Sequence, residues 1–283
     1  MFYQAKKNIR KIGFNCGLEI RNIIAPYRKG QAIGLPESIS NPIFLCSYPR
    51  SGNTWTRMLI TYLINRGKIQ PDIDNIDYYV PDLDNKKYIK NFLGEGKYSR
   101  FFKTHSPKLF FMPRIIYNVR DPRDAEASNF LYWTRATETN MSLGEFLFRR
   151  STHKFGFWFE HVEKAIEFSN FYPNRILFVK YEDLKSNPIQ ELQRIAEFSN
   201  LKVNDSSQYE QAVESCLLSK QKSISKKSEN PWKKYTLQKG EVNIYQEIFA
   251  DQVLLNRFLD FCGSTPNKLG YALEDFKSTP NLK

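Results

Sequence analysis

Residues 44–67 constrain the fold of this chain most, because three local patterns follow one another there. A short apolar run at 44–47 is typical of a buried strand, and Pro49 ends it. A small polar turn follows. Apolar side chains then recur at helical spacing, at Trp55, Met58, Leu59, Tyr62 and Leu63. Gly67 stands where a C-terminal cap is expected, so the segment predicts a strand, a loop and a helix.

The same order of elements recurs along the chain. β-branched and aromatic residues predict further strands at 101–105, 114–120 and 175–180. Asp121 and Pro122 suit the N-cap and the first position of a helix, and further helices are expected at about 188–199 and 246–262. Alternating strands and helices predict a single α/β domain, with a central parallel β-sheet of about four or five strands flanked by helices on both faces.

The turn after the first strand has the chemistry of an anion site. In a strand–loop–helix unit, backbone N–H groups and the positive end of the helix dipole point at one place. Four residues suit this role by charge, by hydroxyl donation or by backbone freedom: Arg50, Ser51, Gly52 and Thr54. The pattern GxxxxGK[ST] is absent, so the loop is P-loop-like without being a Walker A sequence. His105 and Arg120 end two other predicted strands, at the edge where parallel sheets bind ligands.

The composition bounds the partners and the compartment. The chain has 283 residues and a formal charge of +12, which favours an anionic partner without choosing among a small polyanion, a nucleic acid and a membrane surface. Its four cysteines form no CxxC pair, which argues against a zinc site or a disulfide framework. No apolar run approaches the ~20 residues of a membrane span, and no secretory h-region is evident. A cytoplasmic protein is therefore expected.

Three regions are expected along the chain. Residues 1–40 form a basic N-terminal arm, 41–276 the folded domain and 277–283 a C-terminal tail. Apolar residues among the basic ones would let the arm make peripheral contact with an anionic membrane, although a solvated arm packed on the domain is the commoner outcome. Residues 70–100 and 130–152 are expected to shape a pocket. The acidity of the first of these either complements a cationic ligand or belongs to a solvated loop.

Five segments of the chain resemble, in order, the motifs of sulfotransferases that use 3′-phosphoadenosine-5′-phosphosulfate (PAPS). They lie at 48–55, 102–105, 119–128, 181–188 and 237–245. In that order they are similar to the 5′-phosphosulfate loop, the strand with the catalytic histidine, the 3′-phosphate segment, a motif near the adenine and the RKGxxGxW-type segment. The resemblance spans about 43–274. An ordered set of motifs is more specific than any single motif.

The resemblance implies transfer of a sulfuryl group from PAPS to a hydroxyl, or an amine, of a small molecule such as a secondary metabolite. Adenosine 3′,5′-bisphosphate (PAP) would be released, and no metal would be needed. His105 would be the general base, while Arg50 and Lys103 would stabilise charge on the sulfuryl group and the leaving phosphate. The residues implied in binding the donor are Arg50, Ser51, Gly52, Asn53, Thr54, Trp55, Arg120, Ser128, Tyr181, Ser215, Leu217, Lys239 and Gly240.

Four positions depart from the family's pattern. Arg50 stands where many members have a lysine, and arginine cannot donate a proton at neutral pH. In the last motif, Gln238 replaces an arginine, Asn243 a glycine and Tyr245 a tryptophan. These three departures bear on how the segment fits over the 3′-phosphate.

Two other functions stay open. A nucleotide-dependent kinase would also place a phosphate loop on a parallel sheet, although the Walker lysine and a clear magnesium-binding carboxylate are missing. A nucleic-acid-binding protein would use the charge and the aromatic residues, although no such binding motif occurs and the basic residues are dispersed. His153 and His161 fall on one predicted helix among aromatic residues, which is typical of structural histidines. The sequence sets neither the acceptor nor the oligomeric state.

Overall fold

The computed structural model describes residues 41–85, 99–217, 219–221, 231–237 and 240–271. The predicted arm at 1–40 and tail at 277–283 lie outside these residues, as do Gln238 and Lys239.

The centre of the molecule is a four-stranded sheet in which every neighbouring pair is parallel, as predicted. Its strands are β1 (Ile43–Ser47), β2 (Phe101–Thr104), β3 (Ile115–Val119) and β4 (Ile176–Lys180), in the order β2-β1-β3-β4. The register pairs Phe44 of β1 with Phe102 of β2 and with Ile115 of β3. β2 and β4 are the edge strands.

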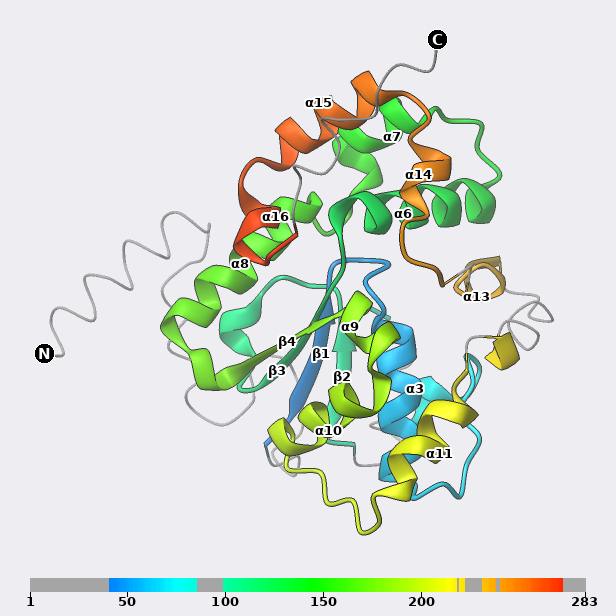
Figure 1. Ribbon diagram of the computed structural model, residues 1–283, viewed down its shortest axis with the longest axis vertical. Coiled ribbons are helices and arrows are strands. Elements are labelled where there is room, and N and C mark those ends of the chain that lie inside the picture. The colour runs from blue at the N-terminus through cyan, green and yellow to red at the C-terminus, as the bar shows by residue number, and fades with distance from the viewer. Residues whose placement is uncertain (1–40, 86–98, 218, 222–230, 238–239, 272–283) are drawn as a thin grey trace, which may run out of the picture.

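Alternate side chains of the strands enter two apolar layers, because successive residues of a strand point to opposite faces. Ile43 and Leu45 belong to one layer, and Phe44 and Cys46 belong to the other. The first layer is covered by α3 (Asn53–Ile64), α4 (Ile76–Tyr79), α9 (Tyr181–Ser186), α10 (Pro188–Phe198) and α11 (Ser207–Ser215). The second is covered by η3 (Leu109–Phe111) and α8 (Trp158–Phe171). Figure 1 shows α8 on one side of the sheet and α3, α10 and α11 on the other.

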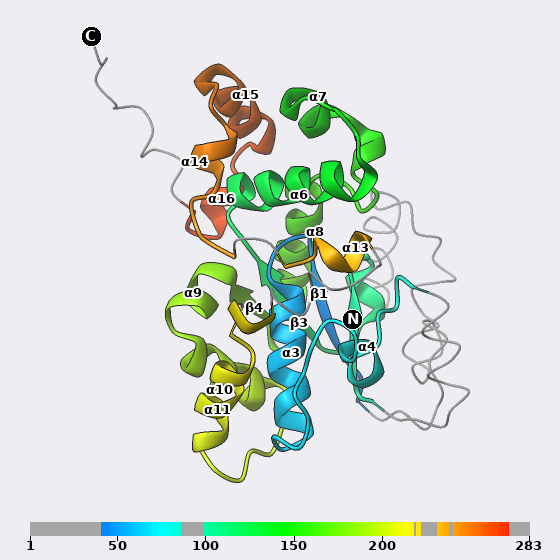
Figure 2. The same ribbon diagram turned by 90° about the vertical axis from the view of Figure 1, so that its right-hand side faces the viewer.

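A third apolar cluster lies beyond the carboxyl ends of the strands, where Figures 1 and 2 show α6, α7, α14 and α15 grouped together. These helices are α6 (Pro122–Thr137), α7 (Leu143–Phe148), α14 (Tyr245–Ile248) and α15 (Gln252–Cys262). The short elements η4 (Arg150–Thr152), η5 (Pro173–Arg175), α13 (Pro231–Lys234) and α16 (Thr265–Lys268) complete the fold. α6 follows β3 directly, so this cluster forms one wall of the space above the sheet.

The helix ends follow local chemistry. Asp121 caps α6 as predicted, since its side chain accepts a hydrogen bond from the backbone N–H of Arg123. α3 is capped at Asn65, and Gly67 then takes a left-handed φ of 72°. The N–H of Gly67 donates to the carbonyl of Tyr62, which closes the end of the helix.

Two predictions about helices were wrong. The helix expected at 246–262 is split into α14 and α15, because Asp251 has extended backbone and caps the second helix through the N–H of Val253. His153 does not share a helix with His161, because Gly156 takes a left-handed φ of 92° between them and α8 begins only at Trp158. His153 instead follows η4.

Candidate active site

A cavity of about 640 Å³ lies at the carboxyl ends of the strands. The segment that follows each of the four strands contributes a residue to its lining. Arg50 lies in the loop after β1, and His105, Arg120 and Tyr181 directly follow β2, β3 and β4. Because the carboxyl ends of parallel strands meet at one edge of a sheet, segments more than 130 residues apart in the chain converge here.

The loop between β1 and α3 is tightly constrained. Arg50 and Gly52 both have left-handed backbone, with φ of 68° and 92°. A Cβ on Gly52 would lie 2.7 Å from Cδ2 of Tyr181, so this position needs glycine for space as well as for conformation. Asn53 holds the loop against β1 by donating from Nδ2 to the carbonyl of Leu45 at 3.1 Å. The loop is thus fixed before any ligand binds.

Buried donors without a hydrogen-bond partner collect around this loop. Among the described residues, none accepts from the Ser51 hydroxyl, from Nε1 of Trp55 or from Nε of Arg120. Buried polar groups are nearly always paired, so three unpaired donors beside one cavity point to a ligand with several acceptors. The backbone N–H of Trp55 is not one of them, since it donates to the carbonyl of Gly52 at 3.0 Å.

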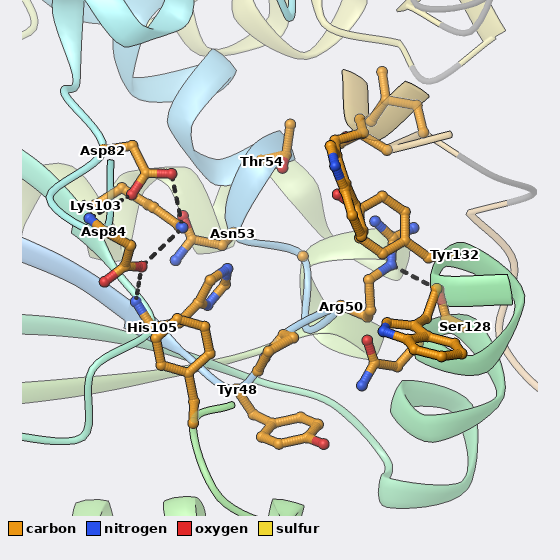
Figure 3. Close-up of a pocket in the computed structure, with 18 of the residues that line it drawn as sticks. Tyr48, Arg50, Asn53, Thr54, Asp82, Asp84, Lys103, His105, Ser128 and Tyr132 are labelled. Carbon is orange, nitrogen blue, oxygen red and sulfur yellow. Dashed lines mark hydrogen bonds and ion pairs between the residues drawn. The ribbon is translucent and has the colours of Figure 1, made fainter. Parts of the chain in front are cut away.

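Two guanidinium groups give this side of the cavity its positive charge. Nε of Arg50 donates to the Ser128 hydroxyl at 3.2 Å, and its guanidinium lies 4.6 Å from the centroid of the Tyr132 ring (Figure 3). In the described part of the chain, no carboxylate forms an ion pair with Arg50. Burial, together with the nearby charge of Arg120, lowers the pKa of Arg50 to about 10. An anion placed here would relieve the unfavourable burial of positive charge.

Arg120 is 4% exposed and links β3 to the segment that begins at Gly240. It donates to the carbonyl of Glu241 at 2.6 Å and to Asp124 at 3.4 Å. Asp124 in turn accepts from the backbone N–H groups of Asn243 and Tyr245. Asn243 takes a left-handed φ of 64°, a conformation that asparagine tolerates better than most residues. The asparagine therefore preserves a backbone turn that would otherwise favour glycine.

His105 is held in one tautomer. Its Nδ1 lies 2.8 Å from the carbonyl oxygen of Ser47, which can only accept, so Nδ1 carries the proton and Nε2 is left with a free lone pair. The ring packs against Phe155, with centroids 5.4 Å apart. Burial and the nearby Lys103 lower the pKa of His105 to about 3, against the opposing charge of Asp84. The imidazole is therefore neutral at physiological pH, and Nε2 carries no proton.

Lys103 lies between two carboxylates beside His105 (Figure 3). Its Nζ is 2.9 Å from Asp82 and 3.1 Å from Asp84. Burial would raise the pKa of Asp82, but the charges of Lys103 and Arg57 outweigh it and hold that pKa below its usual range. Asp82 and Asp84 thus pair with a lysine of the protein itself.

The comparison with protein families tests the resemblance that the sequence motifs carry. The sulfotransferase domain family matches residues 40–264. The chain belongs to this family. The resemblance seen in the sequence motifs is thereby confirmed.

The family's curated members are related to this chain over part of their length. Sulfotransferase 1B1 of the dog is 28% identical over 184 residues, which cover 58% of this chain and 60% of that protein. Flavonol 4′-sulfotransferase of Flaveria chlorifolia is 27% identical over 194 residues, covering 62% and 60%. The chain therefore spans about 60% of the length of these relatives.

Two solved structures share the fold of this chain. Mouse sulfotransferase SULT7A1 complexed with PAP superposes with a TM-score of 0.59 at 23% identity, covering 79% of this chain and 83% of that one. Retinol dehydratase in a complex with retinol and PAP gives 0.60 at 20% identity, covering 85% and 83%. These likenesses establish the α/β architecture.

Not every residue implied by the family motifs reaches the cavity. Those that line it are Arg50, Gly52, Asn53, Thr54, Trp55, Lys103, His105, Arg120, Ser128, Tyr181 and Gly240. Ser51 lies just behind the lining, fully buried. Ser215 and Leu217 do not line it: the hydroxyl of Ser215 donates to Gln70, and Leu217 is 38% exposed. Lys239 lies outside the described residues.

Several lining residues carried no sequence motif. Tyr132 lies one helical turn after Ser128 on α6, a spacing that would have placed both on one face. Phe155 packs on His105, and no local pattern signals that contact. The expected pocket segments both contribute, the first through Asp82 and Asp84, and the second through residues around Ser151. The second extends beyond the predicted end at 152, as far as Gly156.

Within the described ranges, no group of three or more histidine, cysteine or acidic side chains is arranged to hold a metal ion. Nor does any described helix have the length and apolar character needed to cross a membrane.

Proposed function

We propose that this protein transfers a sulfuryl group from PAPS to an acceptor hydroxyl and releases PAP. The observation that carries the proposal is the position of two buried guanidinium groups, Arg50 and Arg120, on the same cavity as a neutral histidine. Two solved structures of similar fold are complexes with PAP, which supports this choice of nucleotide.

The residues around the loop fit the donor. Ser51 and the amides near it would bind the 5′-phosphate, while Arg120 and Ser128 would bind the 3′-phosphate, because guanidinium and hydroxyl donors suit phosphate oxygens. Trp55 and Tyr181 offer rings for the adenine, with centroids 6.5 Å apart. Two acidic phosphates would also give the unpaired donors near the loop their acceptors.

The transfer step needs a base and a positive field. Nε2 of His105 would take the proton of the acceptor hydroxyl, whose oxygen forms a bond to sulfur as the bond from sulfur to the 5′-phosphate oxygen breaks. Arg50 would stabilise the charge on the sulfuryl oxygens and the leaving phosphate. Lys103 was expected to share this role. Because two carboxylates neutralise it, we assign the larger share to Arg50.

The acceptor is a small molecule that fits beside the donor in the cavity. The names of the relatives include a flavonol 4′-sulfotransferase and a 3-alpha-hydroxysteroid sulfotransferase, which supports a hydroxyl-bearing acceptor. Asp77 pairs with Arg57, and Asp82 and Asp84 share Lys103, so each of these carboxylates already has a cationic partner within the protein. We therefore favour O-sulfation over N-sulfation.

The match at 40–264 supports a sulfotransferase domain at 41–276 preceded by a separate basic arm. Relatives named as cytosolic sulfotransferases support a cytoplasmic location.

The first test is the melting temperature with PAP, ATP and 5′-AMP at matched ionic strength. A ligand at a hundredfold excess over its Kd stabilises the folded state by about 2.7 kcal/mol. We expect a rise of several degrees with PAP and a much smaller rise with 5′-AMP, which lacks the 3′-phosphate. In Arg120→Ala, the rise in melting temperature with PAP should be no larger than the rise with 5′-AMP.

Arg135→Ala is the control, because Arg135 is exposed near the end of α6 and does not line the cavity. It should leave the PAP shift intact. A larger shift with ATP than with PAP in the unaltered protein would contradict the proposed donor.

A further inference from the structure

The backbone of His105 lies just past the sheet. The last paired residues of β1 and β2 are Cys46 and Thr104, so the N–H and C=O of His105 have no partner in the β-ladder. Two side chains bind these groups in place of a neighbouring strand. Asp84 accepts from the N–H at 2.7 Å, and Nε2 of His161 lies 2.9 Å from the carbonyl oxygen. An unpaired carbonyl at the end of an edge strand would otherwise leave this peptide free to rotate.

The contact fixes the tautomer of His161. A carbonyl oxygen only accepts, so Nε2 of His161 carries the proton and Nδ1 must accept. Nδ1 lies 2.6 Å from the hydroxyl of Tyr117 on β3, which is the available donor. The ring of Tyr48 packs edge-on against the same imidazole, with centroids 5.9 Å apart. His161 and Tyr117 are both fully buried, so the imidazole has little freedom to turn.

The first turn of α8 reaches two strand ends at once. Trp158, at the start of the helix, donates from Nε1 to the carbonyl of Arg120 at 3.1 Å. His161, three residues later, donates to the carbonyl of His105. These two carbonyls belong to the residues that follow β2 and β3, which carry the candidate base and a candidate phosphate ligand. A helix that served packing alone would meet these strands with apolar side chains, as the rest of the face does at Val162 and Ala165.

We propose that His161 is a positioning residue that holds the backbone of His105 so that Nε2 of His105 faces the acceptor. The proposal rests on the proposed function, since it concerns the same reaction. His161 does not touch a substrate. It acts through the His105 carbonyl. Tyr117 donates to Nδ1 of His161 and so keeps the proton of His161 on Nε2. A displacement of about 1 Å in a catalytic group can lower a rate by about a hundredfold, so a single hydrogen bond at this place matters for turnover.

The test compares two replacements of His161. His161→Gln keeps an N–H donor at a reach similar to that of Nε2, whereas His161→Leu keeps the bulk and loses the donor. We expect kcat to fall tenfold to a hundredfold in His161→Leu, with the KM for PAPS and the affinity for PAP within about twofold of the unaltered protein. His161→Gln should recover most of kcat. Equal losses in both variants, or an unchanged kcat in His161→Leu, would overturn the proposal.

If His161→Leu does not fold, Tyr117→Phe tests the same positioning role. It removes one hydroxyl and preserves the ring, and we expect kcat to fall severalfold without a change in PAP affinity. Tyr62→Phe is its matched control, because Tyr62 lies in α3 and donates to Gln211 on the surface away from the cavity. An unchanged kcat in Tyr117→Phe would count against the chain of contacts.

A spectroscopic readout separates this proposal from the proposed function. The protein contains only three histidines, so their ring nitrogens can be assigned by 15N NMR in the free protein. We expect His161 as the Nε2–H tautomer and His105 as the Nδ1–H tautomer, and a shift of the His105 signals in His161→Gln and Tyr117→Phe. If these signals appear but no acceptor is sulfated, the proposed function fails and the contacts stand. If His161 is the Nδ1–H tautomer, the positioning role fails regardless of activity.

Discussion

Arg50 and Arg120 lie in a part of the molecule where positive charge is costly. Their guanidinium groups face the rings of Tyr132 and Tyr181 at 4.6 and 4.4 Å, and such cation–π contacts contribute about 0.5–2 kcal/mol each. Removing a charged group from water costs several kcal/mol, so the rings offset only part of that cost. Asp124 and the carbonyl of Glu241 offset a further part for Arg120. The cost that is left, chiefly at Arg50, favours the binding of an anionic ligand.

His105 is the residue whose loss should most affect chemistry and least affect donor binding. General bases typically contribute 10²–10⁴ to a rate, so we expect His105→Ala to lower kcat by about that factor. The affinity for PAP should stay within about twofold, because the phosphate-binding groups come from the loop after β1 and from Arg120. Turnover is measured with PAPS and a phenolic acceptor panel, and PAP binding by calorimetry. A full rate in His105→Ala would remove it as the base.

At the scale of elements, the loop between β1 and α3 depends on close contact with α9. Gly52 lies against Tyr181, the first residue of α9, and the Tyr181 hydroxyl donates to the carbonyl of Gly240 at 2.8 Å. Three segments distant in sequence therefore meet at one ring. A shift of that ring would move the loop and the 240–245 segment together.

Gly52→Ala tests this coupling. A left-handed conformation costs a non-glycine residue about 1–2 kcal/mol, and the new Cβ would also lie 2.7 Å from Tyr181. We expect a loss of about 2 kcal/mol in the free energy of unfolding, together with at least a tenfold weaker affinity for PAP. Urea unfolding and calorimetry measure the two effects.

Gly270→Ala is the matched control for that loop variant. Gly270 also has a left-handed φ, of 72°, but a Cβ there would meet only the end of the flexible Lys180 side chain at 3.5 Å. It should lose stability through its backbone alone and bind PAP normally. Normal PAP binding in Gly52→Ala would show that the Tyr181 contact does not shape the donor site.

At the scale of the whole molecule, local sequence patterns were enough to predict the sheet but not the side-chain contacts between distant segments. Apolar runs ending in polar residues marked the strands, and parallel topology then brought His105 and Arg120 to one edge. The pairing of Lys103 with Asp82 and Asp84 was not predictable, because it depends on how a loop some 20 residues away folds back over β2. The role of Asn243 was equally hidden, since its left-handed backbone becomes evident only in three dimensions.

Two buried histidines should make the stability of the molecule respond to pH in opposite ways. Burial lowers the pKa of His161 to about 4, below its ordinary value of 6.5. The unfolded chain therefore takes up a proton that the folded protein refuses, and stability falls as the pH decreases from 6.5 towards 4. For His153, burial would lower the pKa, but its hydrogen bond with Glu126 outweighs burial and raises it. Between pH 5 and 6 His153 is largely protonated in both states and contributes little slope.

We therefore expect His161→Gln to flatten the pH dependence of the free energy of unfolding between pH 5 and 6 by about 1 kcal/mol per pH unit, the effect of roughly one proton. His153→Gln is the control and should leave that slope nearly unchanged while lowering stability overall. Urea unfolding at pH 5.0, 5.5 and 6.0 gives the three slopes, and the contributions of the carboxylates and of His105 cancel in the comparison. Equal slopes in the unaltered protein and His161→Gln would mean that His161 is protonated in the fold. Protonated Nδ1 could not accept from Tyr117, so the contacts proposed to position His105 would then be wrong as well.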